Sequence, residues 1–283
     1  MVQVRLESPT RVVAYMGSLE VGSLRFSTNR LHFHPRIFYL KFLVGENQGD
    51  VPRALYERAL TVLGPQDPLL LYTGADQDGP LLPALRALGF RPFRYVYFPA
   101  LDVQAFRLSS LGAAVARSEA LGYRVLRLSD LGPTPGTKRQ LYRLFGEVYA
   151  DTSTVVPATL ERLTPGEWWA EFVEDEAVIP EAFFVALKGD ELAGFANLFR
   201  GEVDGELETG PFGTARRHRP QHLEVMLALK AYEIAYAKAH GYRTIRAEID
   251  ADNPLVLQVC AELPMTQGRD HVSLVRVPRW RAL

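Results

Sequence analysis

Apolar side chains follow two different spacings along the chain, and these spacings predict alternating strands and helices. In the C-terminal half, residues 223–240 carry apolar side chains three and four positions apart, which predicts a long helix with one buried stripe. A short alternating run at 206–209 precedes it, and a strand-like run at 244–249 follows it. Gly241 stands where helices commonly end in a left-handed residue. A strand, a helix and a returning strand together predict a βαβ unit.

The N-terminal half repeats this order of elements, which predicts two domains built on one plan. The matching pairs are hairpins at 11–26 and 183–198, strands at 37–44 and 206–209, helices ending near Leu63 and His240, returning strands at 69–73 and 244–249, and closing strands at 94–98 and 271–277.

The expected division is a first domain at 1–102, a connecting helix at 103–122 and a second domain at 123–283. Only the second half has a further strand at 123–128 followed by helices at 137–150 and 167–174. The expected fold class is therefore α/β (α+β): two domains, each a mixed, mainly antiparallel sheet flanked by helices, with the first helices missing from the N-terminal domain.

Composition excludes several functional classes. The 283 residues are 47% hydrophobic and 23% charged, as in globular proteins, and are enough for two domains with separate cores. A formal net charge of −1 argues against a general field for nucleic acid or membranes. No run approaches about 18 consecutive apolar residues, and the start lacks the apolar core of a signal peptide. A single cysteine excludes an intramolecular disulfide, so a cytoplasmic protein is expected.

Basic side chains gather in the loop that leads into the long C-terminal helix. Backbone N–H groups and the helix dipole at such a position attract phosphate. We therefore expect a phosphorylated cofactor at this loop; the alternative is a solvated basic turn. The residues expected to bind it are Thr214, Ala215, Arg216, Arg217, Arg219, Gln221, His222 and Leu223.

The loop position, the helix sequence LALKAYEIAYAKAHGY and the following IDADNPLVLQ resemble the GNAT superfamily of acyl-CoA-dependent N-acyltransferases. Ala-Leu-Gly-Phe, ending at Phe90, carries the same resemblance in the first half. The resemblance covers almost all of residues 11–280, and the two-domain arrangement is similar to that of mycothiol synthase and related tandem members of the family. The resemblance implies acetyl-CoA as co-substrate, no metal, and an amine of a small molecule or peptide as acceptor, with no nucleic-acid or membrane partner. A homodimer is left open.

The loop departs from the family pattern R/Q-x-x-G-x-G/A because its glycines are missing. If Gln221 is aligned with the first residue of the pattern, Glu224 and Met226 stand where the pattern has Gly or Ala. If Arg219 is aligned with the first residue, His222 and Glu224 stand there. Arginine side chains are then expected to hold the diphosphate. The same departure favours a rival hypothesis, a non-catalytic tandem protein that binds a CoA-like or other anionic ligand or a protein partner.

The resemblance also implies catalytic roles. Glu206 and Glu208 share one face of their strand, and one of them is expected to be the general base; the alternative is a solvated pair. Cys260 stands where the family commonly carries a tyrosine acid, and a thiol with a pKa of about 8.5 is a candidate donor, unless it is a small buried hydrophobe. The matching position in the first half is Leu85, which cannot donate a proton. Asn253 is expected to cap a helix and to contact the pantetheine arm.

Two further features leave alternatives open. His32 and His34 would share a strand face, the minimum for a metal pair, but no third ligand lies nearby in the sequence. Trp168 and Trp169 either line the acceptor pocket, as the resemblance implies, or pack in the core.

Overall fold

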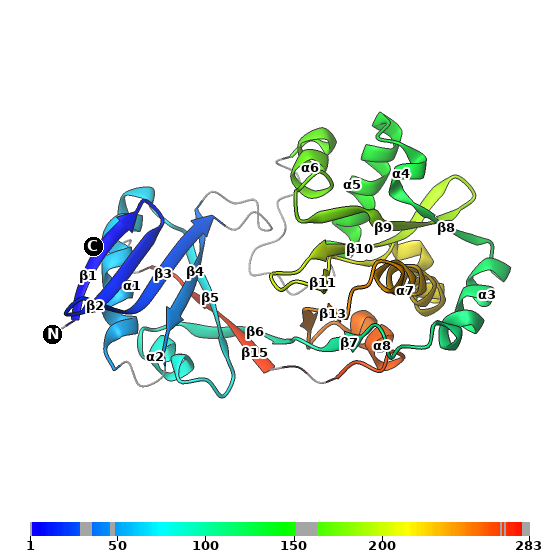
Figure 1. Ribbon diagram of the computed structural model, residues 1–283. Helices are drawn as coiled ribbons and strands as arrows, with labels where there is room; N and C mark the ends of the chain where they lie inside the picture. Colours follow the sequence, from blue (N-terminus) through cyan, green and yellow to red (C-terminus); the bar gives the residue numbers. More distant parts are fainter. Residues whose placement is uncertain are drawn as a thin grey trace. The chain divides into compact units, whose positions relative to one another are not determined.

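The computed structural model describes residues 2–28, 36–45, 49–150, 163–266, 268 and 270–278. The chain forms two compact units (Figure 1). Unit 1 comprises residues 1–96 and 269–283, and unit 2 comprises residues 97–268. This division differs from the expected one, because the last segment of the chain belongs to the first unit.

Unit 1 is a sheet with two helices. Its strands lie in the order β1-β2-β3-β4-β5-β15-β6. Strands β4 and β5 run parallel, whereas β1 to β4 pair antiparallel in sequence order and β15 pairs antiparallel with β5. The elements are β1 (Val2–Ser8), β2 (Arg11–Met16), β3 (Leu19–Thr28), β4 (Ile37–Val44), α1 (Val51–Leu63), the 3-10 helix η2 (Gly64–Gln66), β5 (Leu70–Asp76), α2 (Leu81–Ala87), β6 (Arg91–Tyr97) and β15 (Asp270–Arg276).

Unit 1 lacks the first helices, as predicted, since only two residues separate β1 from β2. Helix α1 begins with Pro52 in its first turn, a position that needs no backbone N–H. Its apolar residues Val51, Leu55, Ala59 and Leu63 recur every fourth position and are all but fully buried. This stripe covers the core of the sheet.

Strand β15 is where the predicted domain plan was wrong. A strand was correctly predicted at 271–277, but as the closing strand of the second domain. Instead it pairs with β5, from His271 opposite Asp76 to Arg276 opposite Leu71, and Val272 and Leu274 are fully buried in unit 1. Figure 1 shows this C-terminal strand beside β5. Conversely, β7 (Ala100–Asp102), which follows the first half, pairs antiparallel with β13 of unit 2.

Unit 2 is a sheet with helices on both faces. Its strands lie in the order β7-β13-β11-β10-β9-β8, and β12 pairs separately with β10. The elements after β7 are the 3-10 helix η3 (Leu108–Leu111), α3 (Gly112–Ala120), β8 (Tyr123–Arg127), α4 (Leu128–Leu131), α5 (Pro135–Tyr149), α6 (Pro165–Phe172), β9 (Val178–Lys188), β10 (Glu191–Arg200), β11 (Glu206–Thr209), β12 (Gly213–Thr214), η5 (Arg216–Gln221), α7 (His222–Ala239), β13 (Thr244–Arg246), β14 (Ile249–Asp250) and α8 (Pro254–Ala261).

Neighbouring side chains of β9 show how the two faces are covered. Phe183 lies against Phe195, which contacts Phe145 of α5, whereas Phe184 contacts Tyr232 of α7. Adjacent strand residues point to opposite faces, so α5 and α7 cover opposite sides of the sheet. The two-domain architecture of mixed, mainly antiparallel sheets flanked by helices is confirmed.

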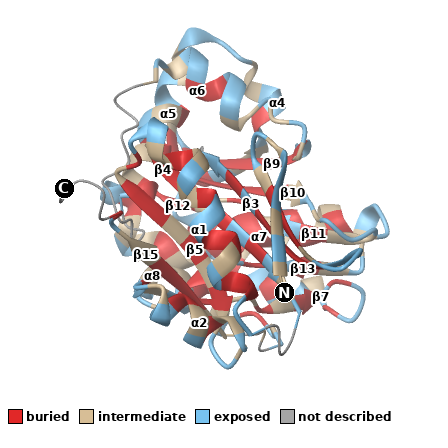
Figure 2. Ribbon diagram, turned by 90° about the vertical axis from the view of Figure 1, so that its left-hand side faces the viewer, coloured by how far each residue is buried: buried red, intermediate tan, exposed pale blue. Residues whose placement is uncertain are grey.

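Helix α7 is more deeply enclosed than its sequence suggested. The prediction of one buried stripe was wrong, because the six consecutive residues from Val225 to Lys230 are all buried (Figure 2). The sheet covers one side, while α3 and α8 pack against others. The expected connecting helix is present at 108–120, within unit 2, and forms part of this enclosure.

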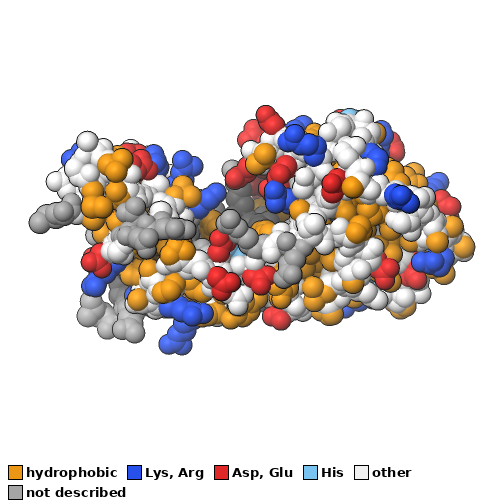
Figure 3. Space-filling model, turned by 60° about the horizontal axis from the view of Figure 1, so that its bottom comes forward, with side chains coloured by type: hydrophobic (Ala, Val, Ile, Leu, Met, Phe, Trp, Pro, Cys, Tyr) orange, Lys and Arg blue, Asp and Glu red, His pale blue; other side chains and the backbone are white. Residues whose placement is uncertain are grey.

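Two surface properties bear on function. None of the helices in the described ranges combines the length and apolar character needed to cross a lipid bilayer. Acidic and basic side chains are interspersed on the face shown in Figure 3, in keeping with the near-zero net charge.

Candidate functional site

The parallel strands β11 and β13 pair over only three residues and then part. The pairs are Glu206 with Thr244, Leu207 with Ile245 and Glu208 with Arg246. Beyond Glu208, β11 leads into β12, which pairs with β10, whereas the backbone N–H of Ala247 donates to Pro99. We call residues 209–214 and 247–250 the strand divergence. From these points the two strands follow neighbours on opposite sides.

Gly210 allows β11 to leave its partner. Its backbone N–H donates to the carbonyl of Asn197, 2.8 Å away, and a Cβ at this position would overlap the Asn197 side chain. Only glycine permits this close approach. The divergence therefore depends on a local sequence feature, Gly210-Pro211.

The two candidate bases have different environments. Both oxygens of Glu206 accept hydrogen bonds from Arg246, at 2.6 and 2.9 Å, and this contact lowers the pKa of Glu206. Partial desolvation raises the pKa of Glu208, and the negative charges of Glu202 and Glu248 raise it further. Among the described residues, none forms a hydrogen bond or ion pair with the Glu208 carboxylate. Glu208, which ends the paired segment, is therefore the better proton acceptor.

The basic loop is held by carboxylates that the sequence analysis did not identify. Residues 216–221 form the 3-10 helix η5, and the backbone N–H of Arg216 donates to Glu147 of α5 over 2.8 Å. Arg217 forms an ion pair with Glu191 at the start of β10. The N–H of Arg216 and the guanidinium of Arg217 thus have carboxylate partners within the protein. No local motif indicates Glu147 or Glu191, because they lie far from the loop in sequence.

The histidines of this segment have structural contacts. His222 is 3% exposed; its Nδ1 lies 2.8 Å from Thr214 Oγ1 and its Nε2 lies 3.2 Å from the carbonyl oxygen of Leu255. His218 Nδ1 lies 3.0 Å from the Tyr123 hydroxyl. Burial lowers the pKa of His218, and the positive charges of Arg217 and Lys188 lower it further. His218 is therefore neutral near pH 7 and adds no cationic charge for a phosphate.

The other expected cofactor residues lie in the same turn. Ala215 is buried and its N–H donates to Ala193, while Gln221 accepts from Tyr123 at 3.3 Å. Leu223 packs on the core, Arg219 is partly buried, and Arg216 and Arg217 are exposed. The only exposed members of the expected set in this turn are thus two arginines.

A polar pocket of about 490 Å³ adjoins the loop. It contains two expected residues, Ala215 and Arg217, beside the two carboxylates that hold the loop. Its lining residues are Gln140, Arg143, Leu144, Glu147, Asp190, Glu191, Leu192, Ala215 and Arg217. Helix α5 and the start of β10 contribute most of these residues, so tertiary packing forms this pocket.

Helix α8 carries the remaining candidates. Asn253 is 5% exposed, and its side-chain oxygen accepts from the N–H of Val256 at 3.3 Å, which confirms the predicted cap. Burial raises the pKa of the Cys260 thiol, and the positive charge of Lys230 opposes this shift. A raised pKa makes the thiol a weaker acid, so the structure gives no support to Cys260 as proton donor.

At the positions where the family pattern has glycines, this chain carries side chains that contact other parts of the protein. Met226 is fully buried in the core of unit 2, and Glu224 is half-buried near Tyr123, whose pKa it raises after the larger effect of burial. The backbone at Met226 is consequently covered. The groups of this loop that could meet an anion are therefore the exposed side chains of Arg216 and Arg217, and the Arg216 N–H where it exchanges its bond to Glu147.

Both tryptophans are buried, and Trp169 also makes a polar contact. Trp168 is 1% exposed and lies among the rings of Tyr142, Phe145 and Phe172, which is a core role. Trp169 donates through its indole N–H to Glu174 at 2.8 Å. His32 and His34 lie outside the described residues. Within the described ranges, no cluster of three or more His, Cys, Asp or Glu side chains is arranged to hold a metal.

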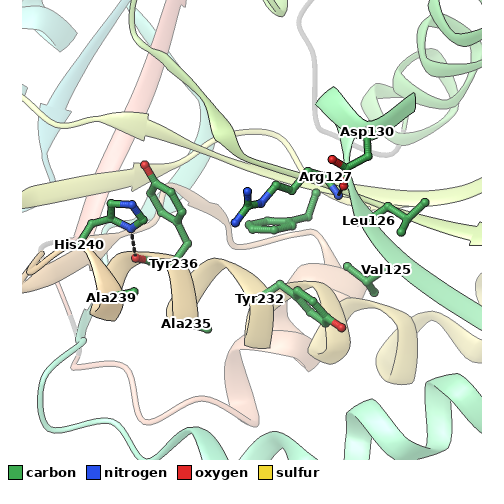
Figure 4. A pocket seen from close by; sticks show the side chains of 10 residues that line it. Val125, Leu126, Arg127, Asp130, Tyr232, Ala235, Tyr236, Ala239 and His240 are labelled. Atoms are coloured by element: carbon green, nitrogen blue, oxygen red, sulfur yellow. Dashed lines mark hydrogen bonds between the residues drawn. The ribbon is translucent and has the colours of Figure 1, made fainter. Parts of the chain in front are cut away.

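A second groove, of about 360 Å³, follows the exposed side of α7 (Figure 4). Tyr232 and Tyr236 come from α7 and His240 directly follows it, while Arg127 and Asp130 lie across from them at the end of β8 and in α4. No local sequence motif indicates this groove.

Comparison with known proteins establishes the type of fold. No family model and no curated protein matches the sequence. Among solved structures, a GCN5-related N-acetyltransferase from Sphaerobacter thermophilus is 12% identical, with a TM-score of 0.66 over 95% of this chain and 81% of that one. A tandem GNAT protein from the clavulanic acid biosynthesis pathway is 16% identical, with a TM-score of 0.66 over 94% and 82%.

A third similar structure is a GCN5-related glucosamine N-acetyltransferase region of a fungal multi-domain β-N-acetylglucosaminidase. It is 14% identical with a TM-score of 0.64, and the match covers 93% of this chain and 32% of that one. At these identities the likeness concerns the fold.

Proposed function

Because the chain has the fold of the GNAT N-acetyltransferases, in its tandem form, we propose that unit 2 is an acyl-CoA-dependent N-acyltransferase. It transfers an acetyl group from acetyl-CoA to an amine of a small molecule or peptide. The observation that carries this proposal is Glu208, a carboxylate with a raised pKa at the point where β11 and β13 part. Unit 1, which lacks the first helices of unit 2, is its structural partner.

The residues of unit 2 have separate roles in this reaction. Acetyl-CoA supplies the thioester. The diphosphate binds to the N–H of Arg216 and to the side chains of Arg216 and Arg217. It takes the places that the carboxylates of Glu147 and Glu191 occupy in the structure. Glu208 accepts the proton from the acceptor amine as its nitrogen attacks the carbonyl carbon. Asn253, at the start of α8, positions the pantetheine arm.

Two measurements test this function. Acetyl-CoA at about 100 times its Kd should stabilise the protein by about 2.7 kcal/mol in a thermal-shift experiment. Release of free thiol is then followed over a panel of amines. Absence of any shift at millimolar acetyl-CoA contradicts the proposal.

The rival function is binding without catalysis. It is favoured by the carboxylates that occupy the loop and by the covered backbone at Met226. A thermal shift with acetyl-CoA but no thiol release with any amine would support it over the enzyme.

The carboxylates around the loop give a first prediction about affinity. Glu147→Gln together with Glu191→Gln removes two negative charges from the diphosphate position, so acetyl-CoA should bind about threefold to tenfold more tightly. Calorimetric titration measures this change. Glu119→Gln, on the exposed side of α3, is the matched control and should leave the affinity unchanged. Weaker binding by the double variant would show that these carboxylates support the ligand.

Asn253 gives a second prediction, which separates its two roles. Asn253→Ala removes the helix cap and should cost about 1 kcal/mol of stability in chemical denaturation. Asn253→Asp caps equally well but lacks the amide donor, so it should keep the stability and raise the KM for acetyl-CoA. An unchanged KM in the Asp variant would limit Asn253 to capping.

A further inference from the structure

Helix α7 carries a buried ion pair that the proposed function does not use. Lys230 Nζ lies 2.7 Å from Glu233 Oε2, and the two side chains are 5% and 1% exposed. Both residues face the interior of unit 2, one turn apart on the same side of the helix. Replacing such a pair with apolar residues is often neutral or stabilising, so packing alone does not explain its presence.

The pair is not fully satisfied by protein groups. Within the described part of the chain, Glu233 Oε1 has no hydrogen-bond partner. The Lys230 ammonium has three N–H donors, and Glu233 Oε2 is the only oxygen that it meets among the described residues. Buried polar groups are rarely left in this state. At least two N–H donors are therefore available to an oxygen or sulfur atom of a ligand.

The ammonium lies beside the strand divergence. Lys230 Nζ is 3.9 Å from the centre of the Phe212 ring, in the link that continues β11 beyond Gly210. Its positive charge also acts on the thiol of Cys260 in α8, the helix that follows β13 and β14. Lys230 thus lies beside the link that continues β11, in which Phe212 stands four residues along the chain from Glu208.

We propose that Lys230 is a catalytic residue that stabilises the thiolate leaving group, with Glu233 holding its ammonium in place. The inference rests on the proposed acyltransferase function. The amine nitrogen forms a bond to the carbonyl carbon and loses its proton to Glu208. The carbon–sulfur bond breaks, its electron pair stays on sulfur, and the thiolate pairs with the Lys230 ammonium. Lys230 keeps its proton; Glu208 returns its proton to water, and the released thiolate takes one from water.

A direct readout is the thiol pKa of bound CoA, followed by the ultraviolet absorbance of the thiolate during a pH titration of the complex. An unbound thiol has a pKa of about 8.5, and the ammonium should lower the pKa of the bound thiol by about one unit or more. Desulfo-CoA is the matched ligand, since it lacks the sulfur. The affinity of the wild-type protein for CoA should increase as the pH rises through the thiol pKa. Its affinity for desulfo-CoA should not change over the same pH range.

The variant for this test is Lys230→Met with Glu233→Gln, which leaves no lone buried charge. It should lower kcat by about 10²-fold, the usual effect of losing one preorganised charge-stabilising group. It should also restore the ordinary pKa of the bound thiol while the affinity for desulfo-CoA stays unchanged. Chemical denaturation checks that the variant is folded.

Three outcomes overturn the inference. No binding of CoA by the wild-type protein removes the proposed function and this role together. If the wild-type protein binds CoA and turns over, but the bound thiol has its ordinary pKa, only the role of Lys230 is contradicted. This measurement needs no variant. A folded double variant with unchanged kcat also contradicts this role alone.

Discussion

Replacing Glu208 by Gln should lower kcat by about 10²- to 10⁴-fold, the usual contribution of a general base, and leave acetyl-CoA binding unchanged. The carboxylate stands at the end of the β11–β13 pairing, free of protein partners among the described residues, and its pKa is raised. The activity should fall as the pH drops through this pKa, which lies above the ordinary value, because the base is then protonated. Thiol-release kinetics over a pH series measure both effects.

Glu206→Gln is the matched control two residues away on the same strand face. Glu206 is paired through both oxygens with Arg246, and this contact lowers its pKa and keeps it ionised. Its replacement should therefore change kcat much less than that of Glu208. The assignment of the base to Glu208 fails if the two variants show the opposite order.

Replacing Leu274 by Ala should destabilise unit 1 by about 2–5 kcal/mol, although this residue lies near the C-terminal end of the chain. Leu274 is fully buried in the core of unit 1, and β15 lies between β5 and β6. Chemical denaturation with a probe in unit 1 measures the loss. Val277→Ala is the control, since Val277 is 64% exposed and should tolerate the change.

Shortening the chain after Gly268 extends this prediction. It removes β15 from within the sheet of unit 1 and leaves β5 and β6 without their common neighbour. Unit 1 should then lose its cooperative unfolding, and the new free edges should promote aggregation. If the truncated chain unfolds in the same way as the full chain, β15 is not a necessary part of the sheet of unit 1.

Local periodicity predicted most of the elements. Helix α7 was expected at 223–240 and is found at His222–Ala239, and β11 has the expected bounds. The returning strand was expected to run from 244 to 249, but β13 ends at Arg246 because Ala247 bonds to Pro99 instead. A strand's own alternation does not say which neighbour it pairs with.

The candidate site was predicted in part. The sequence indicated the two glutamates of β11, the basic loop and the capping role of Asn253. It did not separate Glu208 from Glu206, because Arg246 lies on another strand. It also gave no indication of Glu147 and Glu191, which reach the loop from α5 and β10.

Local patterns in the amino-acid sequence were enough to predict the order of strands and helices, the duplication and the positions of the acidic and basic candidates, since each depends on residues a few positions apart. Three features required the folded chain: the sheet that the last strand joins, the difference between Glu208 and Glu206, and the carboxylates that hold the loop. These depend on groups distant along the chain that packing brings within a few ångströms, and no local period or motif records such distances.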